Sequence, residues 1–218
     1  MSLASETPSK LARRSQQQRR DGTQRKLVEA TLECLIKLGH ARTTTTEIVR
    51  VAGVSQGALF KHYPNKAELL SAAVAHLFEQ LVSGYEANFR ALPQDEASAD
   101  AAFELLWSNF TGPRLAVAFE LYIVARTDAA LAQCLAPVVR HHRSVLVEHA
   151  RALFPEAARD NSEFDAWVDL LMCSMEGIVI EGYGAGSGAP PALAILKRLV
   201  LDTLNRGAGH RTKLALNS

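Results

Sequence analysis

The chain has 218 residues, of which 48% are hydrophobic and 22% are charged. This balance is typical of a folded globular protein and excludes a chain that is disordered throughout. Three scattered cysteines exclude a disulfide framework and argue against a structural zinc site. The lack of a long apolar run argues against a membrane span. We therefore expect a cytoplasmic protein with no metal and no cofactor.

The formal charge changes sign along the chain. Residues 1–66 contain 12 basic and 5 acidic residues, a balance of +7, whereas residues 67–218 contain 12 and 18, a balance of −6. The N-terminal part should therefore attract polyanions and the remainder should repel them, which indicates nucleic-acid contact through the N-terminal part. An ordinary basic tail is the alternative that charge alone leaves open.

The first predicted elements are an arm and a helix. Residues 1–20 have no apolar periodicity and are predicted to form a flexible basic arm. Its arginines could follow a DNA minor groove or remain solvated: Arg13, Arg14, Arg19 and Arg20. Apolar residues from Leu27 to Leu38 then predict an amphipathic helix, which Gly39 ends because glycine tolerates a positive φ.

Polar caps predict the next three helices. Thr44 and Glu47 have the spacing of a capping box, Ser55 is suited to begin a second short helix, and Asn65 a longer one. A tight turn at Gly53 between two short helices is what a helix-turn-helix requires. The apolar core that would fix their crossing consists of Ile48, Val54 and Leu59. A simple αα-corner in some other helical protein is the alternative.

The remaining chain is predicted to be helical in segments that Gly and Pro separate. These segments are 96–110, 114–126, 128–153, 162–182 and 191–206. Pro137 should kink or divide the third of them. No alternating pattern is long enough to predict a strand. The fold class is therefore all-α, with a three-helix head over 21–66 and a larger helical domain over 67–218.

The N-terminal part also resembles the signature of TetR-type transcriptional regulators over about residues 21–70. The residues that carry the resemblance are Leu38-Gly39, Thr43-Thr44, Glu47-Ile48-Val49, Ala52-Gly53-Val54-Ser55, Gly57-Ala58-Leu59-Phe60, His62-Tyr63-Pro64-Asn65-Lys66 and Glu68-Leu69-Leu70. The resemblance implies a helix-turn-helix DNA-binding head followed by a helical domain for ligand binding and dimerisation. Over that second domain it depends on length and helicity alone.

The resemblance also implies individual roles in DNA binding. Thr44 would cap a helix and contact a phosphate, Tyr63 would offer its hydroxyl to the DNA backbone, and Lys66 would pair with a phosphate. The residues along the recognition helix in the major groove would be Ser55, Gln56, Gly57, Lys61 and His62. Two positions depart from the family pattern. Thr45 occupies a position that is usually apolar in the family, and Phe60 stands where a tyrosine often contacts a phosphate.

Large apolar residues of the C-terminal domain are candidates for an effector pocket. At helical spacing most are core residues, but the resemblance implies that some line a cavity: Phe103, Trp107, Phe119, Tyr122, Trp167, Met172 and Met175. These residue types and the charge of −6 predict an apolar or cationic effector rather than a polyanion. His141 and His142 are adjacent, so they should lie on different faces of a helix, and both are predicted to be surface residues.

Two apolar stripes near the C-terminus are candidates for a dimer interface. One contains Phe164, Val168, Leu171, Met175 and Ile178, and the other contains Leu193, Leu196, Val200 and Leu204. The stripes could pack on the chain's own core or on a second copy. The resemblance favours the second copy.

These observations predict a homodimeric, ligand-responsive regulator that binds a pseudo-palindromic operator in double-stranded DNA, with repression favoured over activation. The alternative is a helical small-molecule-binding or interaction protein that does not engage DNA. No Ser/His/Asp or paired-carboxylate group has a recognisable local context, so enzymatic activity is not predicted.

Overall fold

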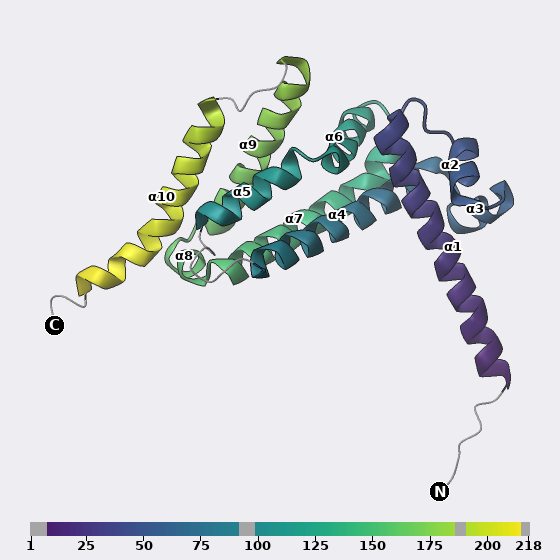
Figure 1. The fold of residues 1–218 in the computed structure, drawn as a ribbon, viewed down its shortest axis with the longest axis horizontal. Helices are drawn as coiled ribbons and strands as arrows, with labels where there is room; N and C mark the ends of the chain where they lie inside the picture. The colour runs from purple at the N-terminus through teal and green to yellow at the C-terminus, as the bar shows by residue number, and fades with distance from the viewer. Residues whose placement is uncertain (1–7, 92–98, 186–190, 215–218) are drawn as a thin grey trace, which may run out of the picture.

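The computed structural model describes residues 8–91, 99–185 and 191–214, and these residues form ten helices and no strand (Figure 1). In chain order the helices are α1 (Pro8–Leu38), α2 (Thr45–Ala52), α3 (Gln56–His62), α4 (Lys66–Arg90), α5 (Ala99–Phe110), α6 (Pro113–Ala125), α7 (Ala129–Leu153), α8 (Pro155–Asp160), α9 (Phe164–Ala185) and α10 (Pro191–Leu214). The predicted all-α fold class is confirmed.

Helices α1, α2 and α3 form a head at one end of the molecule (Figure 1). Ile48 of α2 and Leu59 of α3 are fully buried, and Val54 between them packs against the same core. The predicted apolar core of the helix-turn-helix is therefore confirmed. The C-terminal half of α1, from Leu27 onward, closes this core from one side.

Local hydrogen bonds fix where the helices of the head begin and end. At each predicted N-cap a side-chain oxygen accepts a hydrogen bond from a backbone N–H three residues later: Thr44 from Glu47 at 3.2 Å, Ser55 from Ala58 at 3.2 Å, and Asn65 from Glu68 at 2.9 Å. Gly39 and Gly53 have φ angles of 72° and 64° and end α1 and α2 in the left-handed region. The predicted caps are confirmed.

Helix α1 is longer than the sequence predicted. It begins at Pro8, so residues 8–20 are helical instead of forming a flexible arm, and residues 1–7 lie outside the described part of the chain. Most of this extension consists of Arg, Gln, Lys, Ala and Leu, all strong helix formers. Because the packed half of α1 already supplies the helix nucleus, the N-terminal extension adds hydrogen bonds without a new nucleation cost.

Helix α4 leads from the head into the C-terminal domain, where it runs beside α7 (Figure 1). The predicted boundaries of α5, α6, α7 and α9 agree with the structure to within three residues. Pro137 lies inside α7, which continues through it as one helix, so the chain is not divided there. The short α8 was not predicted. None of the described helices is both long and apolar enough to span a membrane.

Candidate DNA-binding surface and effector cavity

The outer surface of α2 and α3 contains most of the residues predicted to contact DNA. Those that are exposed are Thr44, Ser55, Gln56, Gly57 and Lys61. His62 and Lys66 are half-buried at the C-terminal end of α3 and the start of α4. An ideal Cβ placed on Gly57 meets nothing within 4 Å, so the surface of α3 is open at this point.

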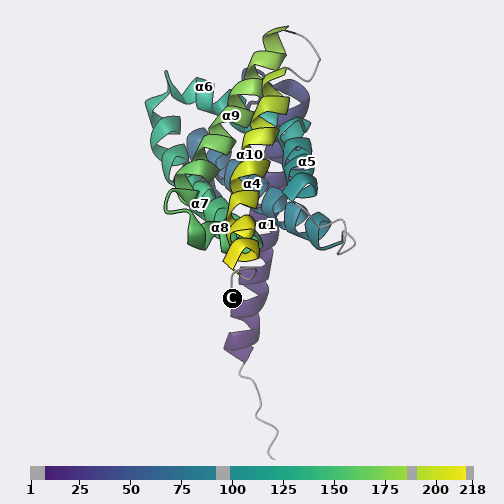
Figure 2. The same ribbon diagram turned by 90° about the vertical axis from the view of Figure 1, so that its left-hand side faces the viewer.

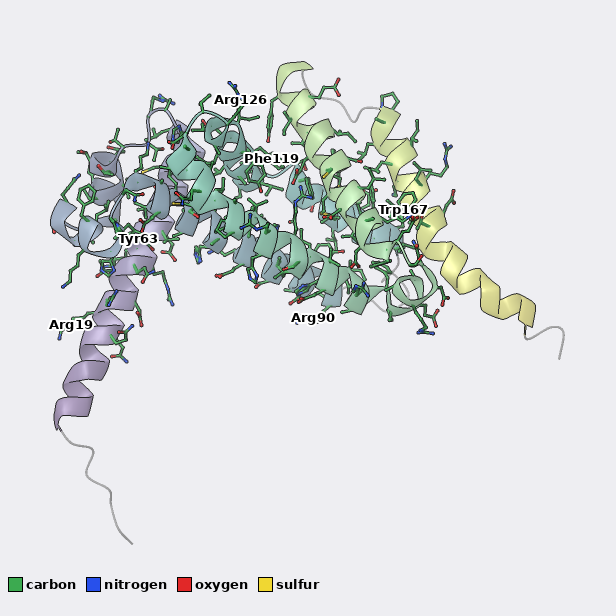
Figure 3. The ribbon with its side chains drawn as sticks, turned by 180° about the vertical axis from the view of Figure 1, so that it is seen from behind. Arg19, Tyr63, Arg90, Phe119, Arg126 and Trp167 are labelled. Atoms are coloured by element: carbon green, nitrogen blue, oxygen red, sulfur yellow. The ribbon has the colours of Figure 1, made fainter. Side chains whose placement is uncertain are left out.

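Tyr63 is the exception among the predicted DNA contacts. Its side chain, labelled in Figure 3, is only 5% exposed. Its buried hydroxyl lies near Gln24 of α1. Phe60 is 46% exposed on α3. Tyr63 therefore stabilises the head from within, and this position does not agree with a hydroxyl that contacts the DNA backbone. The resemblance implied a role for Tyr63 but did not indicate that its side chain is buried, because the burial depends on how α1 packs over α3.

Gln56 of α3 is joined to α2 by a side-chain hydrogen bond. Its Nε2 donates to Oγ1 of Thr45 over 3.0 Å. Thr45 is one of the two positions at which the sequence departs from the pattern of the family that it resembles. The sequence marked this position only as a departure, and the structure shows that the departure supplies a polar partner for an exposed residue of the predicted recognition helix.

Positive charge surrounds the C-terminal end of α3. Burial lowers the pKa of His62, and the nearby charges of Arg20 and Lys61 lower it further. Arg20 belongs to α1, so the extended helix brings basic residues close to the predicted recognition helix. Burial also lowers the pKa of Lys66, while the carboxylate of Asp128 acts in the opposite direction. The basic head predicted from the charge distribution thus gathers cations around one helix.

A carboxylate of α6 connects the head to the C-terminal domain. Oε1 of Glu120 accepts a hydrogen bond from the backbone N–H of His40 over 2.8 Å. An added Cβ at Gly39 would lie 3.2 Å from the same oxygen, so a side chain there would crowd the carboxylate in addition to straining the positive φ. No local sequence pattern indicates this contact, because the two partners are 80 residues apart.

The C-terminal domain contains a cavity of about 150 Å³ between α4, α5, α6, α7, α9 and α10. Four residues predicted for an effector pocket line it: Phe103, Tyr122, Trp167 and Met172. The other three do not. Phe119, labelled in Figure 3, and Met175 are buried in the core, and Trp107 packs against that core. Periodicity identified the buried faces of these helices, but it could not distinguish core from cavity wall.

His142 is a cavity residue that the sequence analysis assigned wrongly to the surface. Its ring stacks on Phe78 of α4 with centroids 3.8 Å apart and planes 8° apart. Burial lowers the pKa of His142 to about 4, so the imidazole is neutral at pH 7. The adjacent His141 is exposed, which agrees with the expectation that the two lie on different faces of α7.

The charged groups of the cavity wall are paired. Arg143 lies 3.3 Å from Asp169 and 3.7 Å from Glu176, measured between nitrogen and carboxylate oxygen. Burial raises the pKa of Glu176, and Arg143 opposes this shift. Burial also raises the pKa of Tyr122, whose phenol is therefore neutral. The wall combines apolar side chains with a few polar groups and a compensated ion pair.

The two C-terminal stripes predicted for a dimer face the chain's own interior. Phe164, Val168 and Met175 are buried, while Leu171 and Val200 line the cavity. The sequence left this choice open, and within the single chain the structure places these residues against the chain's own core and cavity. A different apolar surface of α9 and α10 is exposed, and we call it the α9–α10 face. It contains Leu170, Ile180, Ile195 and Leu199, which are 39–52% exposed. Figure 2 shows α10 at the outside of this end of the molecule.

Comparisons with known proteins identify the family. Residues 27–73 match the model of the family described as bacterial regulatory proteins, tetR family. An uncharacterized HTH-type transcriptional regulator of Mycobacterium bovis is 30% identical over 167 residues, which are 77% of this chain and 86% of the relative. The HTH-type transcriptional regulator CymR of Pseudomonas putida is 30% identical over 175 residues, 77% and 83% of the two chains.

Solved structures share the fold at low sequence identity. A TetR transcription regulator from Haloarcula marismortui aligns with a TM-score of 0.63 and 17% identity, covering 84% of this chain and 97% of that one. The multidrug binding protein EbrR, solved in complex with ethidium, aligns with a TM-score of 0.60 and 16% identity, covering 83% and 98%.

The chain therefore belongs to the TetR family of bacterial regulatory proteins. It is a DNA-binding transcriptional regulator with an N-terminal helix-turn-helix and a helical C-terminal domain. Regulators of this family are generally not enzymes, in agreement with the sequence analysis.

Proposed function

We propose that the protein is a homodimeric repressor that leaves its operator when a small molecule enters the cavity of the C-terminal domain. The observation that carries this proposal is that two helices of the cavity wall also touch the head. Helix α4 contributes Phe78 and Tyr85 to the wall and begins at the end of the helix-turn-helix. Helix α6 contributes Leu115 and Tyr122 and carries Glu120, which binds the turn after α1.

This connection supports release by a population shift. A ligand that binds better when α6 has moved stabilises that arrangement by its difference in affinity for the two states. The hydrogen bond between Glu120 and His40 is 2.8 Å long, so a movement of about 1 Å at α6 breaks it or moves the head. The head would then no longer match the spacing of the operator.

Operator binding requires two heads at a fixed separation. In the proposed complex, the α3 helices of the dimer enter major grooves one helical turn apart, about 34–36 Å, so the site is pseudo-palindromic. The proposed base contacts come from Ser55, Gln56 and Gly57, whose side of α3 is exposed. Thr44, Lys61, His62 and Lys66 are proposed to contact the phosphates or the groove edges around them.

The second copy is proposed to cover the α9–α10 face. Leu170 and Ile180 of α9 are ten residues apart, with exposed Cys173 and Gly177 between them, so all four follow one helical stripe. Ile195 and Leu199 form the matching stripe of the adjacent α10. An apolar surface of this kind supports an isologous four-helix contact with a second copy.

The effector is proposed to be a small apolar or cationic molecule. The cavity volume of about 150 Å³ suits a ligand of about one aromatic ring, and its walls are mainly Leu, Phe and Val. Arg143 is paired with two carboxylates, and no lysine occurs among the residues lining the cavity. A polyanion would have to break that ion pair, which argues against nucleotides.

Two experiments test the proposed function. Selection from a random duplex library should yield a two-fold symmetric sequence that the full-length protein binds with strong salt dependence. A set of uncharged aromatic compounds, aromatic cations and nucleotides should then be compared for thermal stabilisation and for release of that duplex. We expect members of the first two groups to do both. A nucleotide that stabilises the protein and releases DNA, with aromatic compounds inert, contradicts the proposed effector class.

Repression is tested separately by transcription in vitro from a promoter that overlaps the selected sequence. The protein should lower transcript yield, and an active compound from the screen should restore it. An increase in transcript on adding the protein would show activation instead.

A further inference from the structure

The hydrogen bond between Gln56 and Thr45 connects the two helices of the helix-turn-helix at their exposed ends. Gln56 is the first residue of α3, and Thr45 is the first residue of α2, eleven positions earlier. Gln56 is exposed, and Thr45 is half-buried. The bond therefore contributes little to the buried core, but it determines where an exposed amide points.

We infer that Thr45 is a specificity-determining positioning residue, which holds Gln56 so that its amide recognises an adenine in each half-site. The inference builds on the proposed function, in which α3 enters the major groove. Thr45 does not itself touch the base, and it acts through Gln56.

The atoms of the amide explain the choice of base. A glutamine side chain has one carbonyl oxygen that accepts and two N–H groups that donate. One of the N–H groups donates to Oγ1 of Thr45, which leaves the carbonyl oxygen and the second N–H of Gln56 available. Adenine presents a donor at N6 beside an acceptor at N7 in the major groove, and this pair matches what remains on Gln56.

The same bond disfavours guanine. Guanine presents two acceptors, O6 and N7, at the corresponding edge. A free glutamine amide could turn both N–H groups towards these acceptors, but an amide with one N–H committed to Thr45 cannot. The hydrogen bond thus removes an alternative contact and favours one base, which is how discrimination by unfavourable pairing operates.

The anchor is suited to this role because its own side chain is restricted. Thr45 is β-branched and lies in the first turn of a helix, so few χ1 rotamers are accessible to it. Gln56 alone would lose rotamer freedom on binding DNA, whereas Gln56 held by Thr45 has lost part of it already. Valine at position 45 has nearly the shape of threonine but no oxygen acceptor. It therefore isolates the hydrogen bond.

The test compares the full-length protein with Thr45→Val, Thr45→Ser, Gln56→Ala and the double variant Thr45→Val/Gln56→Ala. Each protein is titrated with the duplex selected by the unchanged protein and with duplexes in which single base pairs are replaced. For the unchanged protein we expect one A·T pair per half-site at which replacement by G·C weakens binding by about tenfold or more. Thr45→Val should reduce that penalty by about fivefold, and Thr45→Ser should preserve it.

The double variant separates positioning from a general effect on the head. If Thr45 acts through Gln56, adding Thr45→Val to Gln56→Ala changes no base preference further. Thermal unfolding of each variant shows whether the head is intact, and Thr45→Ser remains informative if Thr45→Val lowers stability. The inference is overturned if Thr45→Val weakens all duplexes equally, leaves the A·T preference intact, or acts as strongly without Gln56. A protein that selects no duplex at all would instead overturn the proposed function.

Discussion

The head and the C-terminal domain are specified by different kinds of information. In the head, α2 and α3 each begin at a polar side chain that accepts a hydrogen bond from the backbone three residues later, as does α4 after them, and two glycines with positive φ end α1 and α2. In the C-terminal domain, apolar periodicity forms the helices, while contacts between distant segments decide which side meets the core, the cavity or the solvent. Local chemistry fixes a motif, whereas a binding cavity depends on packing that no short segment contains.

The largest effect on assembly and DNA binding is expected from a substitution in α10, where two adjacent residues lie in different surroundings. Leu199 is 46% exposed on the α9–α10 face, and Val200 lines the cavity. Leu199→Asp would place an unpaired charge in the proposed dimer contact, which costs several kcal/mol. Light scattering should then show the mass of one chain, with operator affinity reduced by at least a hundredfold. Val200→Ala is the matched control and should remain dimeric.

A dimeric Leu199→Asp variant would show that the α9–α10 face is not the interface. If the unchanged protein is a single chain at micromolar concentration, the homodimer itself is refuted. Neither outcome depends on whether a single head binds DNA. Binding by one head can be measured independently with a half-site duplex at low salt.

The second prediction breaks the contact between the two regions. Glu120→Ala removes the acceptor for the backbone N–H of His40, which is partly buried and would lack this partner. Loss of such a hydrogen bond costs about 1–3 kcal/mol of unfolding free energy, measured by urea denaturation. Glu120→Gln keeps an oxygen acceptor and should lose less than half as much. Equal losses for both variants would show that the charge of Glu120, and not its hydrogen bond, stabilises the contact.

The third prediction concerns how the unfolding free energy depends on pH through His142, a residue of the cavity wall. The pKa of His142 is about 4 in the folded chain because of burial, compared with about 6.5 in an unfolded one. Between these values the unfolded chain binds a proton that the folded chain does not bind. Unfolding free energy therefore decreases as the pH falls from 6.5 towards 4 and is retained above 6.5.

Replacing His142 should flatten this dependence. His142→Phe keeps a ring that can stack on Phe78 but cannot take up a proton. We expect the decrease in unfolding free energy from pH 7 to pH 5 to become smaller by about 1–2 kcal/mol. His141→Gln, at the exposed neighbouring position, is the control and should leave the decrease unchanged. An unchanged decrease in His142→Phe would show that this histidine is not buried in solution.

These residues also show how far the sequence could lead. The caps at Thr44, Ser55 and Asn65 were predictable because each depends on atoms within three residues. The burial of Tyr63 and the position of His142 were not, because each depends on a helix far along the chain, α1 in one case and α4 in the other. Four of the seven residues predicted for the pocket line the cavity, since periodicity separates inside from outside but not one interior region from another.

The smallest effect is expected from Arg20, in the part of α1 that precedes its packed residues from Leu27 onward. Arg20 is exposed and lies near His62, at the end of the predicted recognition helix. Such a charge should attract DNA phosphates without recognising bases. Arg20→Gln keeps a strong helix former, and should weaken binding to all duplexes by a similar, modest factor. The slope of log affinity against log salt should decrease by about one.

The control for Arg20→Gln is the same substitution at Arg198, which is exposed on α10 at the other end of the molecule (Figure 1). The two variants have equal net charge, so a general effect of charge predicts equal slopes. A local contact predicts that only Arg20→Gln changes the slope, because exposed charges farther apart than about 8–10 Å are screened at physiological salt. A change in base preference would instead place Arg20 in a groove, as the sequence suggested for a minor-groove arm. No change at all would show that Arg20 makes no contribution to DNA binding.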